Sequence, residues 1–383
     1  MTSESPLTLL RAARARIDLD RLAANYDAVR AAAGVPVMPV VKADAYGHGA
    51  STIARALVEK GAPRLAVAYV EEGVALRQSG VAVPIVVLAG FAPGQAAVFG
   101  PYDLTPVIST PQTLAAMIAH GHGGTRARAH VKADTGMGRL GFAAEALVEA
   151  ALRLRDAGIE VEGAMTHLAS ADEDAGVTAR QLDRFDDAVS RLAARGLRPP
   201  LIHACNSAGL GLVRPTHTLV RPGLMLYGIR PRPLSPEIDV RPVMQLSADV
   251  SLVKDVAPGT PVSYGGRWVA QRPSRIATIP LGYADGVPRT DRMRDEGAFR
   301  IGPGRVPVAG TVCMDLTMTD VTGRSDVVFG SEAVLFGDDP HVWDVAGWAG
   351  TTSWEILTSV GSRIPRVYVQ GGRIVHVESR YQP

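Results

Sequence analysis

The sequence predicts an α/β protein in two parts, an N-terminal (β/α)8 barrel followed by a mainly antiparallel β domain. From about residue 35 to about residue 228, short runs rich in Val, Ile, Leu and Ala recur between segments with helical spacing. Strands that are buried on both faces of a parallel sheet have this composition. From about residue 243 the runs alternate between apolar and polar residues and are separated by Gly-rich turns, which indicates antiparallel strands.

Eight apolar runs are candidates for the barrel strands. They read VPVMPVVKA, LAVAYV, PIVVLAG, TPVIST, ARAHVKAD, EGAMTHL, LIHACNS and TLVRPGLMLYG. Helical spacing lies between them, first at Leu22, Tyr26 and Val29 and later over 143–154 and 182–192. Eight strand–helix units over this length fit a closed barrel better than a doubly wound sheet.

The C-terminal part contains shorter runs with alternation, which read MQLSADVSLV, SRIATIPL, RVPVAGTV, EAVLFG and RVYVQGGRIVHV. We expect one helix among these strands, because Thr352 and Glu355 have capping-box spacing ahead of Ile356. The predicted domains are residues 12–242 for the barrel and 243–383 for the β domain, with residues 1–11 packing near the second.

Composition excludes several classes of protein. The chain has 383 residues, of which 46% are hydrophobic and 20% are charged, as in a globular protein with a large core. A net charge of +2 without long runs of one sign predicts no nucleic-acid or membrane partner. Cys205 and Cys313 are too few for a disulfide framework, and MTSESPLTLL lacks the features of a signal peptide. We therefore expect a cytoplasmic protein.

Lys42, in VVKADAYGHG, is the first candidate for chemistry. A lysine at the end of a buried strand can simply extend its charge into solvent. Barrel strands, however, direct their C-terminal residues into the active site, where a desolvated lysine can lose its proton and form a Schiff base. Tyr46, in the following turn, offers a phenol to a phosphate group.

VVKADAYGHG resembles the lysine motif of the barrel-type alanine racemases, which are fold type III pyridoxal-phosphate enzymes. The resemblance extends over nearly the whole chain and includes, in the order of the family, VKADTGMGRLGF, THLASADE, HACNSAG, RPGLMLYG, VSYGGRW, LGYADG, TVCMDLT and SRIPRVY. It implies the cofactor pyridoxal 5'-phosphate, the interconversion of L-alanine and D-alanine, and a supply of D-alanine for peptidoglycan.

The resemblance also implies a set of site residues. Lys42 and Tyr264 are the two proton-transfer bases, Arg139 and the backbone at Met314 bind the substrate carboxylate, and no metal is implied. Lys132 matches a lysine that the family carbamylates. Asp315 and Tyr283 match positions that line the entry to the site. The cofactor-binding residues are Lys42, Tyr46, His167, Asn206, Ser207, Arg221, Gly223 and Leu224.

Arg221 bears on reaction type, because the resemblance places it against the pyridine nitrogen of the cofactor. A guanidinium donates a hydrogen bond but does not give up its proton, so the pyridine stays neutral and is a weaker electron sink. This favours racemisation over decarboxylation. Taken alone, Arg221 could equally be an ion-paired arginine at the rim, and Ser207 and Gly223 could be ordinary turn residues.

Tyr264, in VSYGG, is needed because racemisation removes a proton from one face of Cα and delivers one to the other, whereas a lone lysine reaches one face. Tyrosine is a poor base near neutrality unless cations favour its phenolate, and the resemblance places His167 and Arg221 near enough to do so. Since Tyr264 lies in the predicted β domain, the resemblance implies a homodimer with active sites shared between subunits. Without the resemblance, a surface turn tyrosine is the simpler interpretation.

Some residues and alternatives stay open. Cys205 and Cys313 are interpreted as bystanders, and His48 and His203 as structural histidines near the cofactor, since their spacing matches no metal signature. Ser362 stands where several relatives have tyrosine, which could leave room for serine as a substrate. The alternatives are a broad-specificity racemase, a basic amino-acid decarboxylase and a non-catalytic pyridoxal-phosphate-binding protein.

Overall fold

The computed structural model describes residues 11–120 and 127–381, and they divide into two compact units. We call residues 22–46 and 50–240 the barrel unit, and residues 11–21, 47–49 and 241–381 the β unit. The prediction that residues 1–11 pack near the β domain falls mostly outside the described residues. Arg11, the one described residue of that segment, forms an ion pair with Asp285 of the β unit at 2.6 Å.

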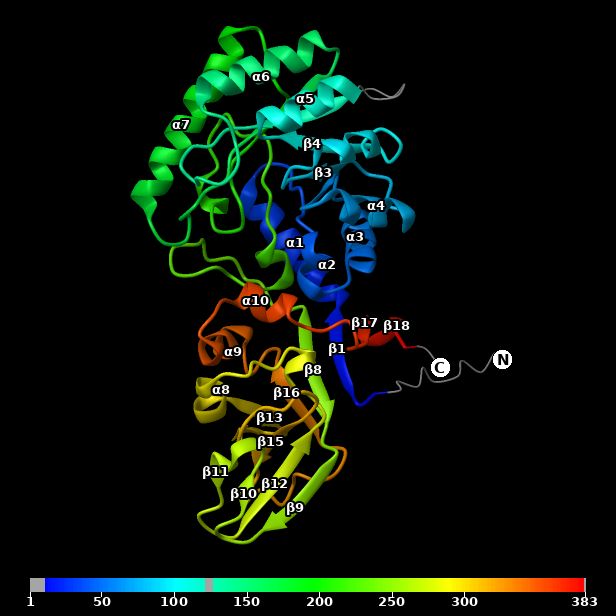
Figure 1. The fold of residues 1–383 in the computed structure, drawn as a ribbon, viewed down its shortest axis with the longest axis vertical. Helices are drawn as coiled ribbons and strands as arrows, with labels where there is room; N and C mark the ends of the chain where they lie inside the picture. The colour runs from blue at the N-terminus through cyan, green and yellow to red at the C-terminus, as the bar shows by residue number, and fades with distance from the viewer. Residues whose placement is uncertain (1–10, 121–126, 382–383) are drawn as a thin grey trace, which may run out of the picture. The chain divides into compact units, whose positions relative to one another are not determined.

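Six parallel strands form one sheet in the barrel unit, and each pairs with the next along the chain (Figure 1). They are short and almost entirely buried, as their uninterrupted apolar composition predicts. The strands are β2 (Leu65–Val67), β3 (Ile85–Val87), β4 (Leu104–Ile108), β5 (Arg128–Lys132), β6 (Glu160–Met165) and β7 (Leu201–His203).

Two further segments close this sheet into the predicted barrel. The first predicted strand bonds to β2 through a parallel bridge between Val40 and Ala66, and to the eighth through a bridge between Val37 and Val220. The eighth in turn bonds to β7, since Thr218 N–H donates to the carbonyl of Ile202 at 2.9 Å. Prolines at 36, 39 and 222 remove ladder donors, so both segments stay below the length of a regular strand. The predicted fold class is confirmed.

Helices connect the strands of the barrel unit. The periodic segments predicted around Leu22, over 143–154 and over 182–192 are all helical, and their apolar faces are buried. The α-helices are α1 (Leu19–Ala33), α2 (Lys42–Gly47), α3 (Ala50–Glu59), α4 (Val70–Gln78), α5 (Pro111–His120), α6 (Ala144–Asp156) and α7 (Ala175–Ala194). Short 3-10 turns are η1 (Pro93–Val98), η2 (Leu210–Leu212) and η3 (Leu224–Tyr227).

The β unit is built mainly from antiparallel strands, as predicted. Its largest sheet has the order β14 (Gly304–Pro307), β13 (Ala298–Ile301), β16 (Glu332–Phe336), β8 (Met244–Asp249), β1 (Ala13–Asp18), β17 (Arg366–Gln370) and β18 (Arg373–Glu378). A second sheet has the order β15 (Thr317–Asp320), β12 (Ser274–Ile279) and β9 (Leu252–Val256). A small hairpin consists of β10 (Pro261–Val262) and β11 (Trp268–Val269).

The structure differs from the predicted domain boundary at residue 12. Strand β1 belongs to the β unit, where it pairs antiparallel with β8 and parallel with β17. Its alternating burial, with Ala13, Ala15 and Ile17 inside, is that of a half-exposed sheet rather than of a barrel strand. Its partners β8 and β17 lie more than 200 residues further along the chain, so no local sequence pattern reveals the pairing.

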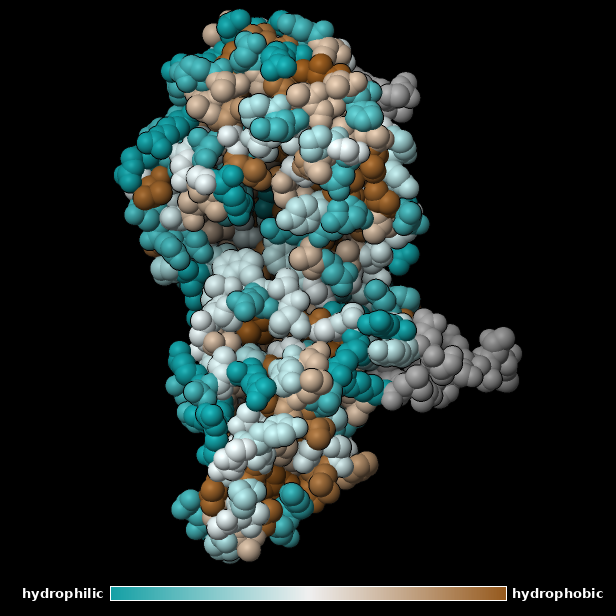
Figure 2. Space-filling model, in the orientation of Figure 1, coloured by the Kyte–Doolittle hydropathy of each residue, from teal (hydrophilic) through white to brown (hydrophobic). Residues whose placement is uncertain are grey.

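Three α-helices lie in the described part of the β unit: α8 (Asp291–Glu296), α9 (Val342–Ala349) and α10 (Ser353–Thr358). The helix expected after Thr352 is α10, although the Thr352 side chain makes no capping hydrogen bond. The unit also has the turns η4 (Tyr264–Gly266) and η5 (Tyr283–Asp285). Figure 2 shows hydrophobic side chains gathered around β9 to β12, where Leu252 and Val269 are exposed. No described helix is long and apolar enough to cross a membrane.

Candidate active site

Lys42 begins a left-handed turn. The four residues from Ala43 to Tyr46 all have φ between 51° and 54°, and none of them is glycine. Such a conformation costs L-residues about 1–2 kcal/mol each, so other contacts must hold it. Glu72 accepts the Ala43 N–H at 2.6 Å, and Asp44 accepts the Ala50 N–H at 2.7 Å. The turn therefore fixes the backbone between Lys42 and Tyr46.

Lys42 is half-buried, and its surroundings favour the neutral amine. Burial lowers the pKa of Lys42, and the charge of Arg139 lowers it further, while Glu72 acts in the opposite direction. A neutral amine is the form that attacks a carbonyl group and accepts a proton. The structure thus gives Lys42 the electrostatic environment of a reactive lysine.

Lys132 and His167 share this cation-rich environment. Burial and the charges of Arg221 and Arg139 lower the pKa of Lys132 to about 8. Burial also lowers the pKa of His167 well below its ordinary value, as do the charges of Arg221 and Lys132. Among the largest influences on the pKa values of Lys42, Lys132 and His167, cations outnumber the carboxylates Glu72 and Asp134. This excess of positive charge suits an anionic ligand.

Arg221 is buried, and four of its N–H groups are used by protein acceptors. Nη1 lies 2.8 Å from His203 Nδ1 and donates to the His203 carbonyl at 2.8 Å. Nη2 donates to the carbonyls of Thr166 and Ala204 at 2.8 and 3.1 Å. Burial lowers the pKa of Arg221 to about 10, which leaves it protonated at neutral pH. Its orientation is therefore fixed, with Nε–H as the remaining donor.

Tyr46, Ser207 and Gly223 form a compact cradle. Ser207 Oγ accepts the N–H groups of Gly223 and Met225 at 3.0 and 3.3 Å. A Cβ at position 223 would lie 2.4 Å from the Tyr46 hydroxyl, so only glycine lets the backbone approach the phenol this closely. The Tyr46 ring packs on Tyr227 with centroids 4.9 Å apart. Hydroxyl groups and backbone amides that converge close to cationic side chains fit a phosphate group.

Arg139 and Asn206 lie on turns that their neighbours stabilise. The Asp134 carboxylate accepts N–H groups from Gly136, Met137 and Gly138 at 2.9 to 3.1 Å, which shapes the loop that carries the exposed Arg139. Asn206 Oδ1 accepts the Gly209 N–H at 3.1 Å. The structure therefore gives Asn206 a turn-forming role, and its side chain reaches none of the other predicted cofactor residues in the described contacts.

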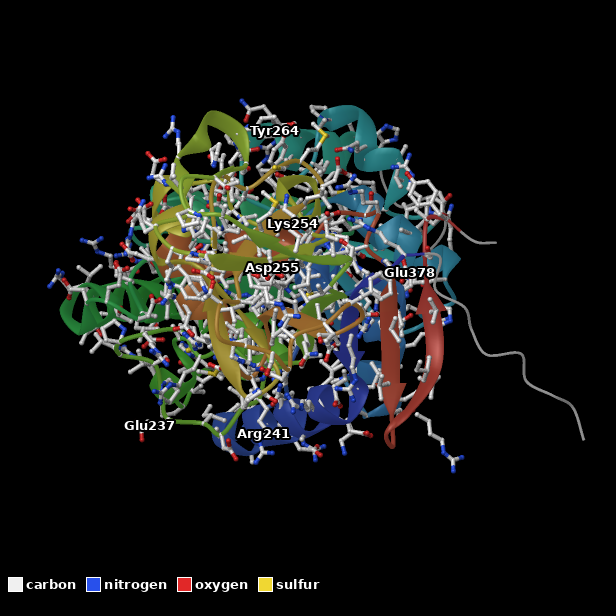
Figure 3. The ribbon with its side chains drawn as sticks, turned by 90° about the horizontal axis from the view of Figure 1, so that it is seen from below. Glu237, Arg241, Lys254, Asp255, Tyr264 and Glu378 are labelled. Atoms are coloured by element: carbon white, nitrogen blue, oxygen red, sulfur yellow. The ribbon has the colours of Figure 1, made fainter. Side chains whose placement is uncertain are left out.

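Tyr264 lies in the β unit, with 67% of the residue exposed. Figure 3 shows it at the periphery of this unit. The preceding Ser263 has φ 66° and ψ −176°, a region that residues other than glycine rarely adopt. Its hydroxyl donates to the Thr311 carbonyl at 2.5 Å, and Thr311 Oγ1 donates to the Tyr264 carbonyl at 3.2 Å. An exposed tyrosine is thus presented on a strained but well-supported turn.

The other predicted residues of the β unit surround a buried carboxylate that the sequence analysis missed. Asp285 binds Arg11 and Arg363, each at 2.6 Å, and Arg363 also pairs with Asp315 at 2.7 Å. Arg363 Nη2 donates to the Met314 carbonyl at 3.4 Å. Burial raises the pKa of Asp285, but hydrogen bonds from the two arginines outweigh it and lower the pKa overall. Its place in LGYADG, two residues after the predicted Tyr283, was the available signal.

Within each unit, the structure brings together residues that are distant in sequence. The barrel unit joins Lys42, Lys132, His167 and Arg221 electrostatically. The cradle belongs to the same unit, since Tyr46 and Gly223 closely follow Lys42 and Arg221 along the chain. Tyr264, Tyr283, Met314 and Asp315 all lie in the β unit and are all exposed. Burial raises the pKa of the Cys205 thiol to about 11, which agrees with a bystander role. No cluster of potential metal ligands occurs among the described residues.

A closed barrel that presents a desolvated lysine, a phosphate cradle and a buried arginine defines the class of barrel-type pyridoxal-phosphate enzymes. Comparison with known proteins then identifies the family. Residues 17–231 match the profile described as alanine racemase, N-terminal domain, and residues 243–368 match alanine racemase, C-terminal domain. The chain belongs to the alanine racemase family.

Individual alanine racemases match this chain over nearly their full lengths. An alanine racemase of Halothermothrix orenii is 40% identical over 371 residues, which cover 92% of this chain and 96% of the relative. The structure of an alanine racemase from D-cycloserine-producing Streptomyces lavendulae has a TM-score of 0.87 at 36% identity, covering 95% of this chain and 98% of that one. One from Bacillus anthracis with bound L-Ala-P has a TM-score of 0.89 at 30% identity, covering 97% and 98%.

These comparisons confirm the predicted family, fold and activity. The chain is a pyridoxal 5'-phosphate-dependent isomerase that interconverts the enantiomers of alanine. The cradle of Tyr46, Ser207 and Gly223 and the uncompensated cations of the barrel unit fit this cofactor. The match of residues 243–368 to the C-terminal domain argues against a single-domain cofactor-binding protein.

Proposed function

We propose that this racemase moves the α-proton of alanine between two bases, Lys42 on one face of the substrate and Tyr264 of the partner subunit on the other. The observation that carries this proposal is the contrast between the two side chains. Lys42 is half-buried with a lowered pKa, whereas Tyr264 is 67% exposed on a turn held by Ser263 and Thr311. An exposed tyrosine on a supported turn suits insertion into another subunit.

The cofactor, when bound, supplies an electron-withdrawing ring that is conjugated with the substrate nitrogen and stabilises negative charge at Cα. Lys42 is the residue to which it attaches. Tyr46, Ser207 and the backbone at Gly223 and Leu224 hold its phosphate. His167 and Arg221 are cofactor-facing groups, and the neutral His167 does not compete for a proton at neutral pH.

Arg221 controls how strongly this electron sink acts. A protonated, buried guanidinium with its terminal nitrogens bound to carbonyls and His203 has Nε–H left to donate, and it would offer this donor to the pyridine nitrogen while keeping its own proton. The cofactor would then act as a weaker electron sink, sufficient for proton exchange at Cα. This supports racemisation and disfavours decarboxylation.

Arg139 binds the substrate carboxylate, because its planar fork matches two carboxylate oxygens. The backbone at Met314 of the partner subunit assists, and Asp315 and Tyr283 of the β unit line the entry. Lys132, whose pKa is about 8, has enough neutral amine at physiological pH to react with carbon dioxide. Carbamylation would turn this cation into an anion that orients Arg139 and reduces the local excess of positive charge.

The proposal includes a homodimer, since the two bases lie in different subunits. It places the enzyme in the cytoplasm, where thiols such as Cys205 and Cys313 remain reduced, and its product D-alanine in peptidoglycan synthesis.

Proton NMR of the holoenzyme with L-alanine or L-serine in heavy water, read out by chiral analysis, tests the reaction and substrate together. We expect loss of the alanine α-proton with accumulation of D-alanine, and little change in serine. Exchange of both substrates would favour the broad-specificity racemase. The exposed Ser362, beside Arg363, is the residue that we would hold responsible for that breadth. In that case Ser362→Tyr should narrow the preference. No exchange of alanine would contradict the proposal.

A further inference from the structure

A chain of polar side chains runs through the interior of the barrel unit from Arg221. Arg221 Nη1 lies 2.8 Å from His203 Nδ1, and His203 Nε2 lies 2.8 Å from His130 Nδ1. His130 Nε2 lies 3.2 Å from Glu162 Oε2, and Arg64 donates to Glu162 Oε1 at 3.4 Å. We call Arg221, His203, His130, Glu162 and Arg64 the polar column.

The polar column runs from the carboxyl ends of the barrel strands toward their amino ends. Arg221 and His203 stand at the carboxyl ends of their strands, His130 and Glu162 in the interiors of β5 and β6, and Arg64 just before β2. Barrel interiors are ordinarily filled by layers of branched apolar side chains. Here Arg221 is 3% exposed, both histidines are 0% exposed and Glu162 is 9% exposed. A buried polar chain of this length is costly unless every member is satisfied.

Gly163 provides the space for this arrangement. A Cβ at position 163 would lie 2.5 Å from His130 Nδ1 and 2.7 Å from His130 Cε1, distances that side chains do not tolerate. The imidazole therefore occupies the place that a side chain on β6 would fill. Glycine at 163 has a packing role in the polar column, although its backbone conformation is ordinary.

Donor and acceptor roles are determined along the whole column. A guanidinium only donates, so His203 Nδ1 must accept, and His203 carries its proton on Nε2. His203 Nε2–H then donates to His130 Nδ1, which leaves the His130 proton on Nε2, directed at Glu162. Every hydrogen bond between Arg221 and Glu162 thus points the same way, and each polarises the next.

Charges reside only at the ends of this chain. Burial and the charge of Arg221 lower the pKa of His203 well below its ordinary value. Burial lowers the pKa of His130 more than Glu162 raises it. Burial opposes ionisation of Glu162, but the hydrogen bond from His130 and the charges of Arg64 and Arg128 outweigh it and lower its pKa to about 2. Two neutral histidines therefore connect a buried cation to a carboxylate.

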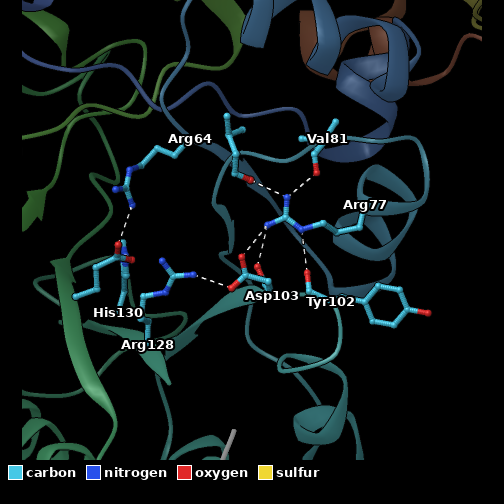
Figure 4. Close-up of polar contacts among 9 residues, drawn as sticks. Arg64, Arg77, Val81, Tyr102, Asp103, Arg128 and His130 are labelled. Carbon is cyan, nitrogen blue, oxygen red and sulfur yellow. Dashed lines mark hydrogen bonds and ion pairs between the residues drawn. The ribbon is translucent and has the colours of Figure 1, made fainter. Parts of the chain in front are cut away.

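A second set of contacts lies beside the far end of the column, as Figure 4 shows. Arg128 binds Asp103 at 2.7 Å, and Arg77 donates to the carbonyls of Val81 and Tyr102 at 2.6 and 2.9 Å. Arg64 binds one oxygen of Glu162 and His130 the other. Glu162 therefore has a partner, Arg64, that does not depend on Arg221.

We propose that His203, His130 and Glu162 are positioning residues that fix the orientation of Arg221 and draw its positive charge toward Glu162. Arg221 Nε–H is then a weaker donor to the cofactor ring than an isolated guanidinium would be. The column thereby limits carbanion stabilisation and keeps the reaction on racemisation. This inference rests on the proposed role of Arg221 and extends it to three residues that contact neither cofactor nor substrate.

The first test uses the wild-type apoenzyme and needs no activity. Nitrogen-15 NMR of the imidazole rings, assigned with single His→Gln variants, reports tautomer and protonation. We expect both His203 and His130 to be neutral Nε2–H tautomers between about pH 5.5 and pH 8, whereas exposed histidines titrate there. Protonation of either ring in this range, or an Nδ1–H tautomer at His203, would overturn the column.

The second test measures abortive transamination. When the proton returns to the cofactor and not to Cα, the alanine amino group stays on the cofactor, water supplies the oxygen, and pyruvate is released. In Glu162→Gln and Gly163→Ala we expect the ratio of pyruvate to D-alanine to rise about fivefold, within the range of couplings measured for residues in one network. Glu160→Gln, on the same strand but outside the column, should leave the ratio unchanged.

Comparing variants separates this inference from the proposed function. If Arg221→Lys alters the ratio but Glu162→Gln and Gly163→Ala only lower the melting temperature, the column has a structural role and the inference is wrong. If Arg221→Lys leaves both ratio and rate unchanged, the proposed role of Arg221 itself fails. The inference predicts non-additive ratios for the double variant Glu162→Gln/Arg221→Lys, because Glu162 acts through Arg221.

Discussion

The barrel unit and the β unit present their candidate catalytic residues in opposite ways. Lys42 and Arg221 lie in a desolvated, cation-rich interior where burial lowers the pKa of each. Tyr264 and Met314 project from the β unit with more than half of each residue exposed. The candidate cofactor residues are thus gathered within the barrel unit, whereas the candidate residues of the β unit are exposed, as the proposed sharing of the site between subunits requires.

The largest effect is expected where the chemistry depends on the barrel interior. Lys42→Ala should abolish attachment of the cofactor and reduce racemisation by a factor of about 10³ or more, since nucleophile and base are lost together. Borohydride reduction followed by mass spectrometry measures attachment, and chiral chromatography measures turnover. Lys60→Ala, on the exposed side of the same unit, is the control. Covalently bound cofactor in the Lys42→Ala variant would show that Lys42 is not the residue to which the cofactor attaches.

The variant Tyr264→Phe tests the contribution of the β unit. We expect the cofactor and its visible absorbance to be retained, because the barrel unit supplies the cradle, while racemisation falls by about 10²–10⁴ through loss of one base. Tyr381→Phe, which alters a similarly exposed tyrosine, should have full activity. Equal activity of the two variants would show that a single base is sufficient.

Lys132 provides a pH-dependent test of the barrel interior. Below its folded pKa of about 8 the neutral amine decreases about tenfold per pH unit, so carbamylation should rise steeply with pH up to that value. Carbon-13 NMR with labelled bicarbonate detects the carbamate, and Lys132→Arg removes the signal.

The same pKa shift has a defined sign for stability. In the apoenzyme without bicarbonate, the unfolded chain binds the Lys132 proton more tightly than the folded chain. The free energy of unfolding should therefore rise with pH between about 8 and 10.5. In chemical denaturation, Lys132→Met should flatten the rise of the unfolding free energy over this pH range. The same slope in the variant and the wild type would argue against a buried amine at Lys132.

The smallest effect concerns the turn after Lys42. Ala43 is exposed and has φ 51°, so Ala43→Gly should raise the free energy of unfolding by about 0.5–1 kcal/mol as left-handed strain is relieved. Ala56→Gly in the middle of α3 should lower it by about the same amount. Destabilisation by Ala43→Gly would show that other contacts fully offset the strain.

The sequence predicts the barrel and its catalytic lysine because both depend on local patterns. Uninterrupted apolar runs mark the strands, and Lys42 stands at the end of one of them with Tyr46 in the following turn. The role of Tyr264 is different. Its exposed turn carries no signal of its own, and only the resemblance to a family indicates that it acts in catalysis.

Features that depend on long-range contacts could not be predicted. Strand β1 looks like part of the barrel but pairs with β8 and β17 of the β unit. His203 was interpreted as a structural histidine. Its hydrogen bond to His130 joins β7 to β5, two strands that β6 separates in the sheet. Glu72 stabilises the turn after Lys42 from α4, two helices further along the chain, and no spacing rule connects the two segments.

Mixing of inactive subunits tests most directly whether the two bases come from different chains. Lys42→Ala and Tyr264→Phe protein, dissociated together and reassociated, should form heterodimers in which one site has both bases and the other has neither. With random pairing, activity should recover to about a quarter of the wild-type value. No recovery, although heterodimers are shown by native mass spectrometry, would contradict an active site shared between subunits.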